Sequence, residues 1–249
     1  MHRLGLAPEE APGLLTELRD ESRLRVAGLM THLAADEGAL RGETALPQRR
    51  FEAVLEELRG SGLLPAEALV HLANSAAFLS DLDPLHGGVR IGGAAYGLGP
   101  HPNLSLGLLE PVLALRARIV HLKGIPPGDR VGYGGTWTAR RPARIATVPL
   151  GYDDGVDWRF SPGGRVLVRG RRVPVVGRIS MDYTTIDVTD VPGLELGERV
   201  TFLGHDGDER VTAEEIARQC GTLAYDVTCS IGKRIERLVL AGPEDVPPA

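Results

Sequence analysis

The sequence predicts an α/β protein in which a parallel βα part precedes a mostly antiparallel β part. Up to about residue 97, short apolar segments alternate with helical patterns, which is typical of βαβ units that share a parallel sheet. Beyond about residue 112, the apolar segments are separated by Gly, Pro and Asp, which favours an antiparallel β-domain. We therefore expect domains at residues 1–112 and 113–241, joined through an irregular stretch at 97–110, and a proline-rich tail at 242–249.

Two helices and three strands are expected in the βα part. Pro8 opens the first helix, with Leu18 on its apolar face. The second helix is predicted by the apolar spacing i, i+3, i+4, i+7 that starts at Phe51, and it should end at Gly60. The expected strands are residues 24–31, 69–73 and 89–96, with a further fragment at 1–6.

The β part is expected to contain one clear helix. Thr212 and Glu215 have the spacing of a capping box and predict that helix at residues 213–219. The remaining segments predict strands at residues 113–122, 130–138, 144–149, 165–168, 173–189, 199–203 and 234–240.

The composition favours small-molecule chemistry. The chain has 249 residues, 28 Lys+Arg against 33 Asp+Glu, a net charge of −5 and 43% hydrophobic residues, which is enough for a real core. Without a basic block, the chain is not expected to bind nucleic acid or an anionic membrane. It shows no signal peptide and no apolar run of about 18 residues, so we expect a cytoplasmic protein. Cys220 and Cys229 lack metal or redox spacing and are expected to be free thiols, with no metal site.

Polar residues follow directly after the expected parallel strands. They are Thr31-His32, Asn74-Ser75 and the run from Arg90 to Gly93. In a (β/α)8 barrel the carboxyl ends of the strands carry the active site, but a closed barrel needs eight strands. This chain supplies at most four, so the sequence predicts part of a TIM barrel followed by the β-domain.

The chain contains a set of ordered motifs: MHRLG (1–5), TH (31–32), HLANSAA (71–77), VRIG (89–92), VGYGGTWT (131–138), TVPLGYDDG (147–155) and GRISMD (177–182). Together they resemble the alanine racemase family. VGYGGTWT and TVPLGYDDG resemble its C-terminal domain, and GRISMD is similar to its substrate-loop motif. Of the upstream motifs, MHRLG resembles a glycine-flanked M-x-R-L-G segment and the other three resemble the later strands of its barrel.

The resemblance implies an enzyme that interconverts L-alanine and D-alanine for peptidoglycan supply, using pyridoxal 5'-phosphate as electron sink. It also implies a homodimer with active sites shared between subunits. Racemisation needs a base on each face of the α-carbon, and the resemblance implies Tyr133, from the partner subunit, for one. The other is a lysine in an A-x-K-A-N-A-Y-G-H-G-like motif, which does not occur here. The chain has two lysines, Lys123 and Lys233, and neither aligns with it.

The same resemblance implies roles for further residues. His32 and Arg90 would form a hydrogen-bonded chain towards the tyrosine and the cofactor, and Arg90 would also donate to the pyridine nitrogen. The cofactor phosphate would be held by Ser75, Gly92, Gly93 and Lys233. The substrate would be bound by Arg3, Met181 and Asp182.

Each of these residues also has a purely structural interpretation. Tyr133 lies between glycines and could simply pack in a turn, while Arg90 could pair with a surface carboxylate. His32 could be a core histidine, and Asn74-Ser75 could be an ordinary helix N-cap. Asp182 could be a turn residue. Lys233 stands where the family commonly has a tyrosine, so it is either a substitute phosphate partner or an exposed cation.

Three hypotheses follow. The chain is an alanine racemase that lacks the N-terminal part of its barrel, a non-catalytic remnant whose β-domain mediates dimerisation, or one component of an enzyme whose first strands and lysine come from a separate polypeptide. Broader amino-acid racemases share much of the pattern, so the substrate range stays open. In each case the unpaired edge of the parallel sheet predicts aggregation or dependence on a partner.

Overall fold

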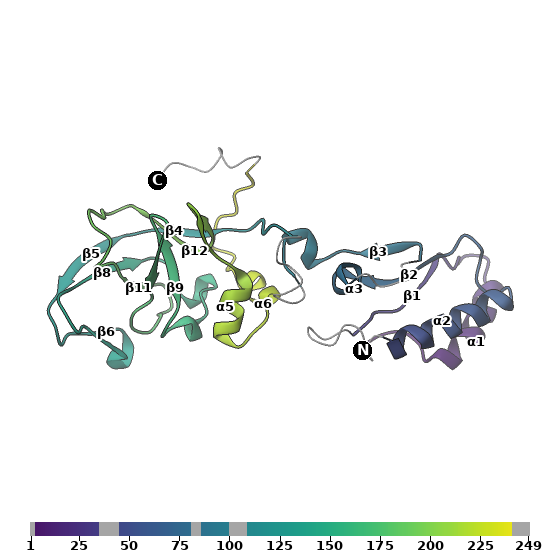
Figure 1. The fold of residues 1–249 in the computed structure, drawn as a ribbon. Helices are drawn as coiled ribbons and strands as arrows, with labels where there is room; N and C mark the ends of the chain where they lie inside the picture. The colour runs from purple at the N-terminus through teal and green to yellow at the C-terminus, as the bar shows by residue number, and fades with distance from the viewer. Residues whose placement is uncertain (1–2, 35–44, 81–85, 100–108, 241–249) are drawn as a thin grey trace. The chain divides into compact units, whose positions relative to one another are not determined.

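The computed structural model describes residues 3–34, 45–80, 86–99 and 109–240 (Figure 1). It divides the chain into two compact units, Met1–Glu110 and Pro111–Ala249. The expected tail, and most of the irregular stretch at 97–110, lie outside the described residues. Among the described residues, no helix combines the length and the apolar character that crossing a bilayer requires.

The first unit is built on a three-stranded parallel sheet in the order β1-β2-β3. Its strands are β1 (Gly28–Met30), β2 (Leu69–Asn74) and β3 (Gly88–Arg90). Met30 pairs with His71, and Asn74 pairs with Arg90. This register gathers the carboxyl ends of all three strands at one edge.

Helices cover this sheet and supply its core. They are α1 (Ala11–Arg19), preceded by the 3-10 turn η1 (Pro8–Glu10), α2 (Ala45–Gly60) and the short α3 (Ser75–Leu79). Apolar residues of α1 and α2 pack against β2 in one buried cluster, because each helix places them on one face. The cluster includes Ala11, Leu15, Phe51, Leu55, Leu58, Val70, Leu72 and Ala73.

Two expectations for this unit are wrong. The expected strand at 89–96 ends at Arg90, and residues 93–96 form the 3-10 helix η2 (Gly93–Tyr96). The chain leaves the strand at Gly92, whose ψ of −99° is not extended. In addition, the described part of the 1–6 fragment contains no strand.

The second unit consists of antiparallel sheets. The largest has the order β10-β9-β12-β13, with β4 also paired to β12, and two smaller sheets have the orders β11-β8-β5 and β6-β7. The strands are β4 (Leu115–Arg118), β5 (His121–Ile125), β6 (Arg130–Val131), β7 (Trp137–Thr138), β8 (Ala143–Val148), β9 (Arg165–Val168), β10 (Arg171–Pro174), β11 (Thr184–Asp187), β12 (Arg199–Asp206) and β13 (Glu209–Val211).

Short helices complete this unit. The expected helix is α5 (Ala213–Cys220), and the Thr212 hydroxyl accepts the Glu215 N–H at its start. The Glu215 carboxylate does not return to the cap; instead it binds Arg172 at 2.5 Å. A second helix, α6 (Ala224–Cys229), was not expected. Three 3-10 turns are present as well: η3 (Tyr133–Gly135), η4 (Tyr152–Asp154) and η5 (Trp158–Phe160).

Several predicted strands of this unit are interrupted. Residues 113–122 split between β4 and β5, and residues 130–138 are broken by η3. The long segment at 173–189 contains β10, a loop at 177–182 and then β11, and residues 234–240 form no strand. A change of partner strand separates β4 from β5, and glycines interrupt the segments at 130–138 and 173–189.

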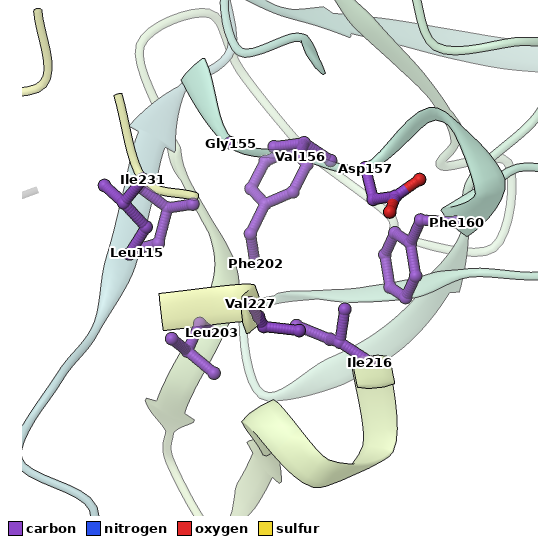
Figure 2. Close-up of a pocket in the computed structure, with 10 residues that line it drawn as sticks. All are labelled: Leu115, Gly155, Val156, Asp157, Phe160, Phe202, Leu203, Ile216, Val227 and Ile231. Atoms are coloured by element: carbon purple, nitrogen blue, oxygen red, sulfur yellow. The ribbon is translucent and has the colours of Figure 1, made fainter. Parts of the chain in front are cut away.

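A small apolar cavity lies between these helices and β12 (Figure 2). Ile216 of α5 and Val227 of α6 face Phe202 of β12 across it, and Ile231 closes one side. Asp157 is the one charged side chain among the residues drawn. Ile231 belongs to the chain segment after α6, so the apolar packing around this cavity holds that segment against the β-domain.

Candidate functional site

Arg90 is the centre of the site in the first unit. Its Nη1 lies 2.6 Å from Nδ1 of His71, and its Nη2 donates to the carbonyl oxygens of Thr31 (3.0 Å) and Leu72 (3.2 Å). Nη2 also lies 3.4 Å from Nδ1 of His32. Thr31 and His32 directly follow β1, and His71 and Leu72 lie within β2, which the parallel register places next to β3.

The two imidazoles around Arg90 are neutral. A guanidinium can only donate, so Nδ1 of His71 must present a lone pair and Nε2 must carry the proton. Burial lowers the pKa of His71, and the positive charge of Arg90 lowers it further. Burial also lowers the pKa of His32, with additional effects from Arg90 and from Arg3.

Arg90 is held without a carboxylate. None of the ion pairs among the described residues involves Arg90, so its expected alternative role in a surface ion pair is not what the structure shows. Burial lowers its pKa, but a guanidinium of this kind stays charged. Nε–H and one Nη1–H have no acceptor among the described residues. The charge is therefore free to face a ligand that accepts hydrogen bonds.

An anion-binding arrangement follows directly after Arg90. The Ser75 hydroxyl oxygen accepts the Gly92 N–H at 2.9 Å, and Ser75 is 7% exposed. Because its oxygen already accepts, the hydroxyl proton is left to donate. The N-cap of α3 is Asn74, whose Oδ1 accepts the Ala77 N–H at 2.9 Å, so Ser75 does not have the capping role.

Backbone groups add to this arrangement. A Cβ built on Gly92 would meet nothing within 4 Å, which leaves room for a ligand to approach the main chain. Gly93 is the first residue of η2, where the N–H has no partner inside the helix. A hydroxyl and backbone N–H groups at a turn suit a phosphate.

Tyr133 in the second unit is displayed on a braced turn. The residue is 74% exposed and lies between Gly132 and Gly134, whose φ angles are 75° and 69°. Arg130 Nε donates to the Gly135 carbonyl at 2.9 Å and fixes the turn. The Tyr133 side chain is not buried in turn packing, contrary to that interpretation of its flanking glycines.

The loop at 177–182 lies against this turn. A Cβ on Gly132 would come within 2.6 Å of the Arg178 nitrogen, so the close approach requires glycine. Further along the loop, the Met181 carbonyl accepts the Asp153 N–H at 3.1 Å. Met181 is 52% exposed, and its N–H has no acceptor among the described residues.

Arg234 joins this loop to the chain segment after α6, and the sequence analysis missed it. Its Nη2 donates to Asp182 Oδ1 at 2.6 Å, and its Nε donates to Asp154 Oδ1 at 2.6 Å. These carboxylates, Asp154 first, raise the pKa of Arg234. Its partners lie 52 and 80 residues away in the sequence, so no local motif could indicate these contacts.

The other predicted residues are exposed. Arg3 is exposed, and its positive charge is one of the smaller causes of the lowered pKa of His32. Lys233 is exposed and adjoins Arg234. The predicted site residues thus divide between the two units. The first unit contains Arg3, His32, Ser75, Arg90, Gly92 and Gly93. The second unit contains Tyr133, Met181, Asp182 and Lys233. His71 also belongs to the first unit and was not predicted as a site residue.

Two family models match this chain. The C-terminal domain of alanine racemase matches residues 112–239, which is more than half of the chain. The chain belongs to the alanine racemase family. The N-terminal domain of alanine racemase matches residues 1–100. The family resemblance and the predicted fold class, part of the barrel followed by a β-domain, are both confirmed.

Individual alanine racemases agree with this assignment. The chain is 42% identical over 241 residues to the enzyme of Sorangium cellulosum, which covers 95% of this chain and 63% of that relative. It is similar to the solved alanine racemase from D-cycloserine-producing Streptomyces lavendulae, with a TM-score of 0.89, 32% identity and coverage of 98% and 64%. It is also similar to the solved alanine racemase from Bartonella henselae with covalently bound pyridoxal phosphate, with a TM-score of 0.81 and 29% identity. That match covers 96% of this chain and 63% of the other. The chain spans less than two thirds of the length of these relatives.

We predict that Arg90→Gln raises the pKa values of His32 and His71 in an NMR titration. The substitution removes the positive charge beside both rings but not their burial, so both values should rise and stay below the ordinary value of about 6.5. Arg141→Gln is the matched control, because its partner is an exposed Asp190 in the other unit. Unchanged histidine pKa values in Arg90→Gln would contradict the electrostatic coupling.

The lowered pKa values also predict how stability depends on pH. The unfolded chain binds protons at these histidines below about pH 6.5, before the folded chain does. Their contribution is therefore fully present above about pH 6.5 and is lost as the pH falls through the lower folded-state values. His71→Gln, whose amide oxygen can still accept from Arg90, should flatten this slope in urea unfolding measured across pH.

Proposed function

We propose that this chain forms the cofactor-holding and substrate-facing part of an alanine racemase that depends on pyridoxal 5'-phosphate. The reaction interconverts L-alanine and D-alanine in a homodimer with shared active sites, as a cytoplasmic step in peptidoglycan supply. One observation carries the proposal: a charged Arg90, held by neutral imidazoles and carbonyls, lies two residues before an anion-binding turn at the carboxyl ends of parallel strands.

The residues fit the cofactor chemically. Ser75 offers a hydroxyl proton, Gly93 offers an N–H without a partner inside η2, and the space beside Gly92 is open for the phosphate. Lys233 would add a positive charge there. Arg90 has donors left over for the lone pair of the pyridine nitrogen. When bound, pyridoxal phosphate supplies an electron sink for the carbanion left by loss of the α-proton.

Arg90 also determines the kind of chemistry that this site favours. Because a guanidinium does not accept a proton, a ring nitrogen that accepts from Arg90 carries none. Arg90 would thereby keep the bound cofactor a weaker electron sink, which would favour return of the proton over side reactions. The neutral state of His71 preserves this arrangement, since a protonated ring would repel Arg90 and release the Nη1 contact.

Tyr133 and the loop residues act on the substrate in this proposal. The exposed phenol is presented to a partner subunit and exchanges the α-proton on one face, with His32 linking it to Arg90. A phenol with an ordinary pKa of about 10 is a weak base near neutrality, so neighbouring positive charge is required to stabilise the phenolate. The substrate carboxylate is bound by Arg3 and by the Met181 N–H, beside Asp182.

The second base is not assigned to a residue of this chain. Lys123 lies in β5, paired with Ile145, and Lys233 is exposed in the second unit. Both belong to the second unit, and neither aligns with the family's lysine motif. The missing motif favours two alternatives to be tested alongside the proposal: a lysine-bearing segment supplied by a separate polypeptide, and a non-catalytic chain whose β-domain dimerises.

The decisive experiment measures D-alanine formation from L-alanine with added pyridoxal phosphate. The chain is assayed alone and mixed with the part of the Sorangium cellulosum enzyme that it does not cover, then reduced with borohydride and mapped by mass spectrometry. We expect D-alanine and a pyridoxyl label on the added segment in the mixture. Activity of the chain alone, with a label on Lys123 or Lys233, would move the base to that lysine. Absence of both product and label in each arm would leave the non-catalytic alternative.

Ser75→Ala should weaken the binding of pyridoxal phosphate by about tenfold, because one charge-assisted hydrogen bond to the phosphate is lost. Binding is followed by the absorbance of the cofactor. Pyridoxal, which has no phosphate, should bind wild type and variant equally. Ser80→Ala, at the other end of α3, should behave like the wild type. Equal loss for both ligands would mean that Ser75 does not contact the phosphate.

Tyr133→Phe should lower kcat in the racemisation assay by about 10²–10⁴-fold, which is the usual contribution of a positioned acid–base group. Cofactor affinity should be unchanged, because Tyr133 is not among the residues that hold the cofactor. Tyr183→Phe, another exposed tyrosine, is the control. Unchanged racemisation by Tyr133→Phe would remove this residue from the mechanism.

A further inference from the structure

Three chain segments of the second unit meet around the Arg234 guanidinium. Arg234 contacts Asp154 twice, through Nε to Oδ1 at 2.6 Å and through Nη2 to Oδ2 at 3.1 Å. The same Nη2 donates to Asp182 Oδ1 at 2.6 Å. One side chain therefore links the η4 turn, the loop at 177–182 and the segment that follows α6.

The Asp154 end of this link is rigid. Asp154 is 3% exposed, its Oδ2 also accepts the Gly151 N–H at 2.9 Å, and its carbonyl accepts the Gly232 N–H at 3.0 Å. Ile231, two residues before Lys233, is buried at the apolar cavity (Figure 2). The contacts with Asp154 therefore hold the guanidinium in place independently of Asp182.

The Asp182 end lies beside the exposed backbone of the loop. The Ser180 carbonyl accepts the Tyr152 N–H at 3.0 Å, and the Met181 carbonyl accepts the Asp153 N–H at 3.1 Å. A Cβ on Gly151 would lie 2.2 Å from the Met181 oxygen, so only glycine allows the main chains of the two loops to approach this closely. These bonds fix the Met181 peptide and leave its N–H without an acceptor among the described residues.

An unpaired carboxylate at position 182 would oppose the binding of an anion at the neighbouring Met181 N–H. Like charges a few ångströms apart near a protein surface repel measurably, even in water. An exposed ion pair adds little to stability by itself, since ordering two long side chains offsets its attraction. Here the guanidinium is already ordered by Asp154, so it can neutralise Asp182 at small entropic cost.

We propose that Arg234 is a positioning residue for the carboxylate site at Met181. By engaging Asp182 from a fixed position, it cancels the charge that would repel a substrate carboxylate, and it keeps the loop attached to the η4 turn. This inference rests on the proposed function, because the carboxylate site at Met181 belongs to that proposal. It adds a residue that binds no substrate and acts through Asp182.

The test uses acetate as the probe and the Met181 amide signal in NMR titrations of the full chain. In the wild type, acetate should shift this signal to saturation. Asp182→Asn should raise the affinity for acetate, because part of the positive charge of Arg234 is then no longer balanced by position 182. Arg234→Gln should lower it about fivefold, the effect of one nearby unscreened charge at the surface. The double variant Arg234→Gln/Asp182→Asn should return to within about twofold of the wild type.

The rescue separates positioning from a purely structural role, since removing a second side chain would not repair a damaged fold. Arg234→Gln leaves Asp154 buried without its partner, so Arg234→Lys is measured too. Lysine lacks the fork that reaches both carboxylates, so affinity should again fall and be restored by Asp182→Asn. Arg141→Gln, which breaks an exposed pair with Asp190 in the same unit, should not change acetate binding.

Different failures have different meanings. If acetate does not shift the Met181 signal in the wild type, both this inference and the carboxylate site of the proposed function are wrong. If acetate binds but Asp182→Asn weakens it, or the double variant shows no recovery, the inference is wrong while the proposed carboxylate site stands.

Discussion

The first unit depends on one partly buried positive charge. A charge removed from water is costly unless its hydrogen bonds are replaced, and Arg90 obtains its partners from main-chain carbonyls and imidazole nitrogens. Only the parallel register brings those acceptors to one place. Because a carboxylate is not among them, the charge is oriented but not cancelled, which is what a ligand with a lone pair or a negative charge needs. His71 is neutral because burial and the nearby charge of Arg90 both lower its pKa.

The second unit handles charge in the opposite way. Arg234 is surrounded by carboxylates and is fully paired, and it serves to fix backbone rather than to face a ligand. Other arginines of this unit also bridge segments through carbonyls and carboxylates: Arg144, Arg169 and Arg172. A forked donor suits this use better than an ammonium group does. The scarcity of lysine in the sequence is consistent with it.

The sequence predicted the parallel strands and the polar residues at their ends, because alternation and strand-end placement are local signals. The motifs predicted Tyr133 and the Met181 loop through their family resemblance. His71 escaped because it lies within an expected strand and not directly after one, and its role depends on the register with β3. Arg234 escaped because both its partners are distant in sequence. The 3-10 helix at 93–96 escaped because an apolar, glycine-containing run also fits a strand.

Three glycines at the close contacts of the η4 turn have a consequence for protein engineering. At Gly151, Gly155 and Gly232, a Cβ would come within 2.7 Å of neighbouring backbone atoms. Random libraries at these sites would mostly displace the loop at 177–182 or the segment after α6, whatever side chain is chosen. Directed evolution of substrate preference in this unit is better aimed at exposed neighbours such as Tyr152 and Trp158, where side chains can change without moving the main chain.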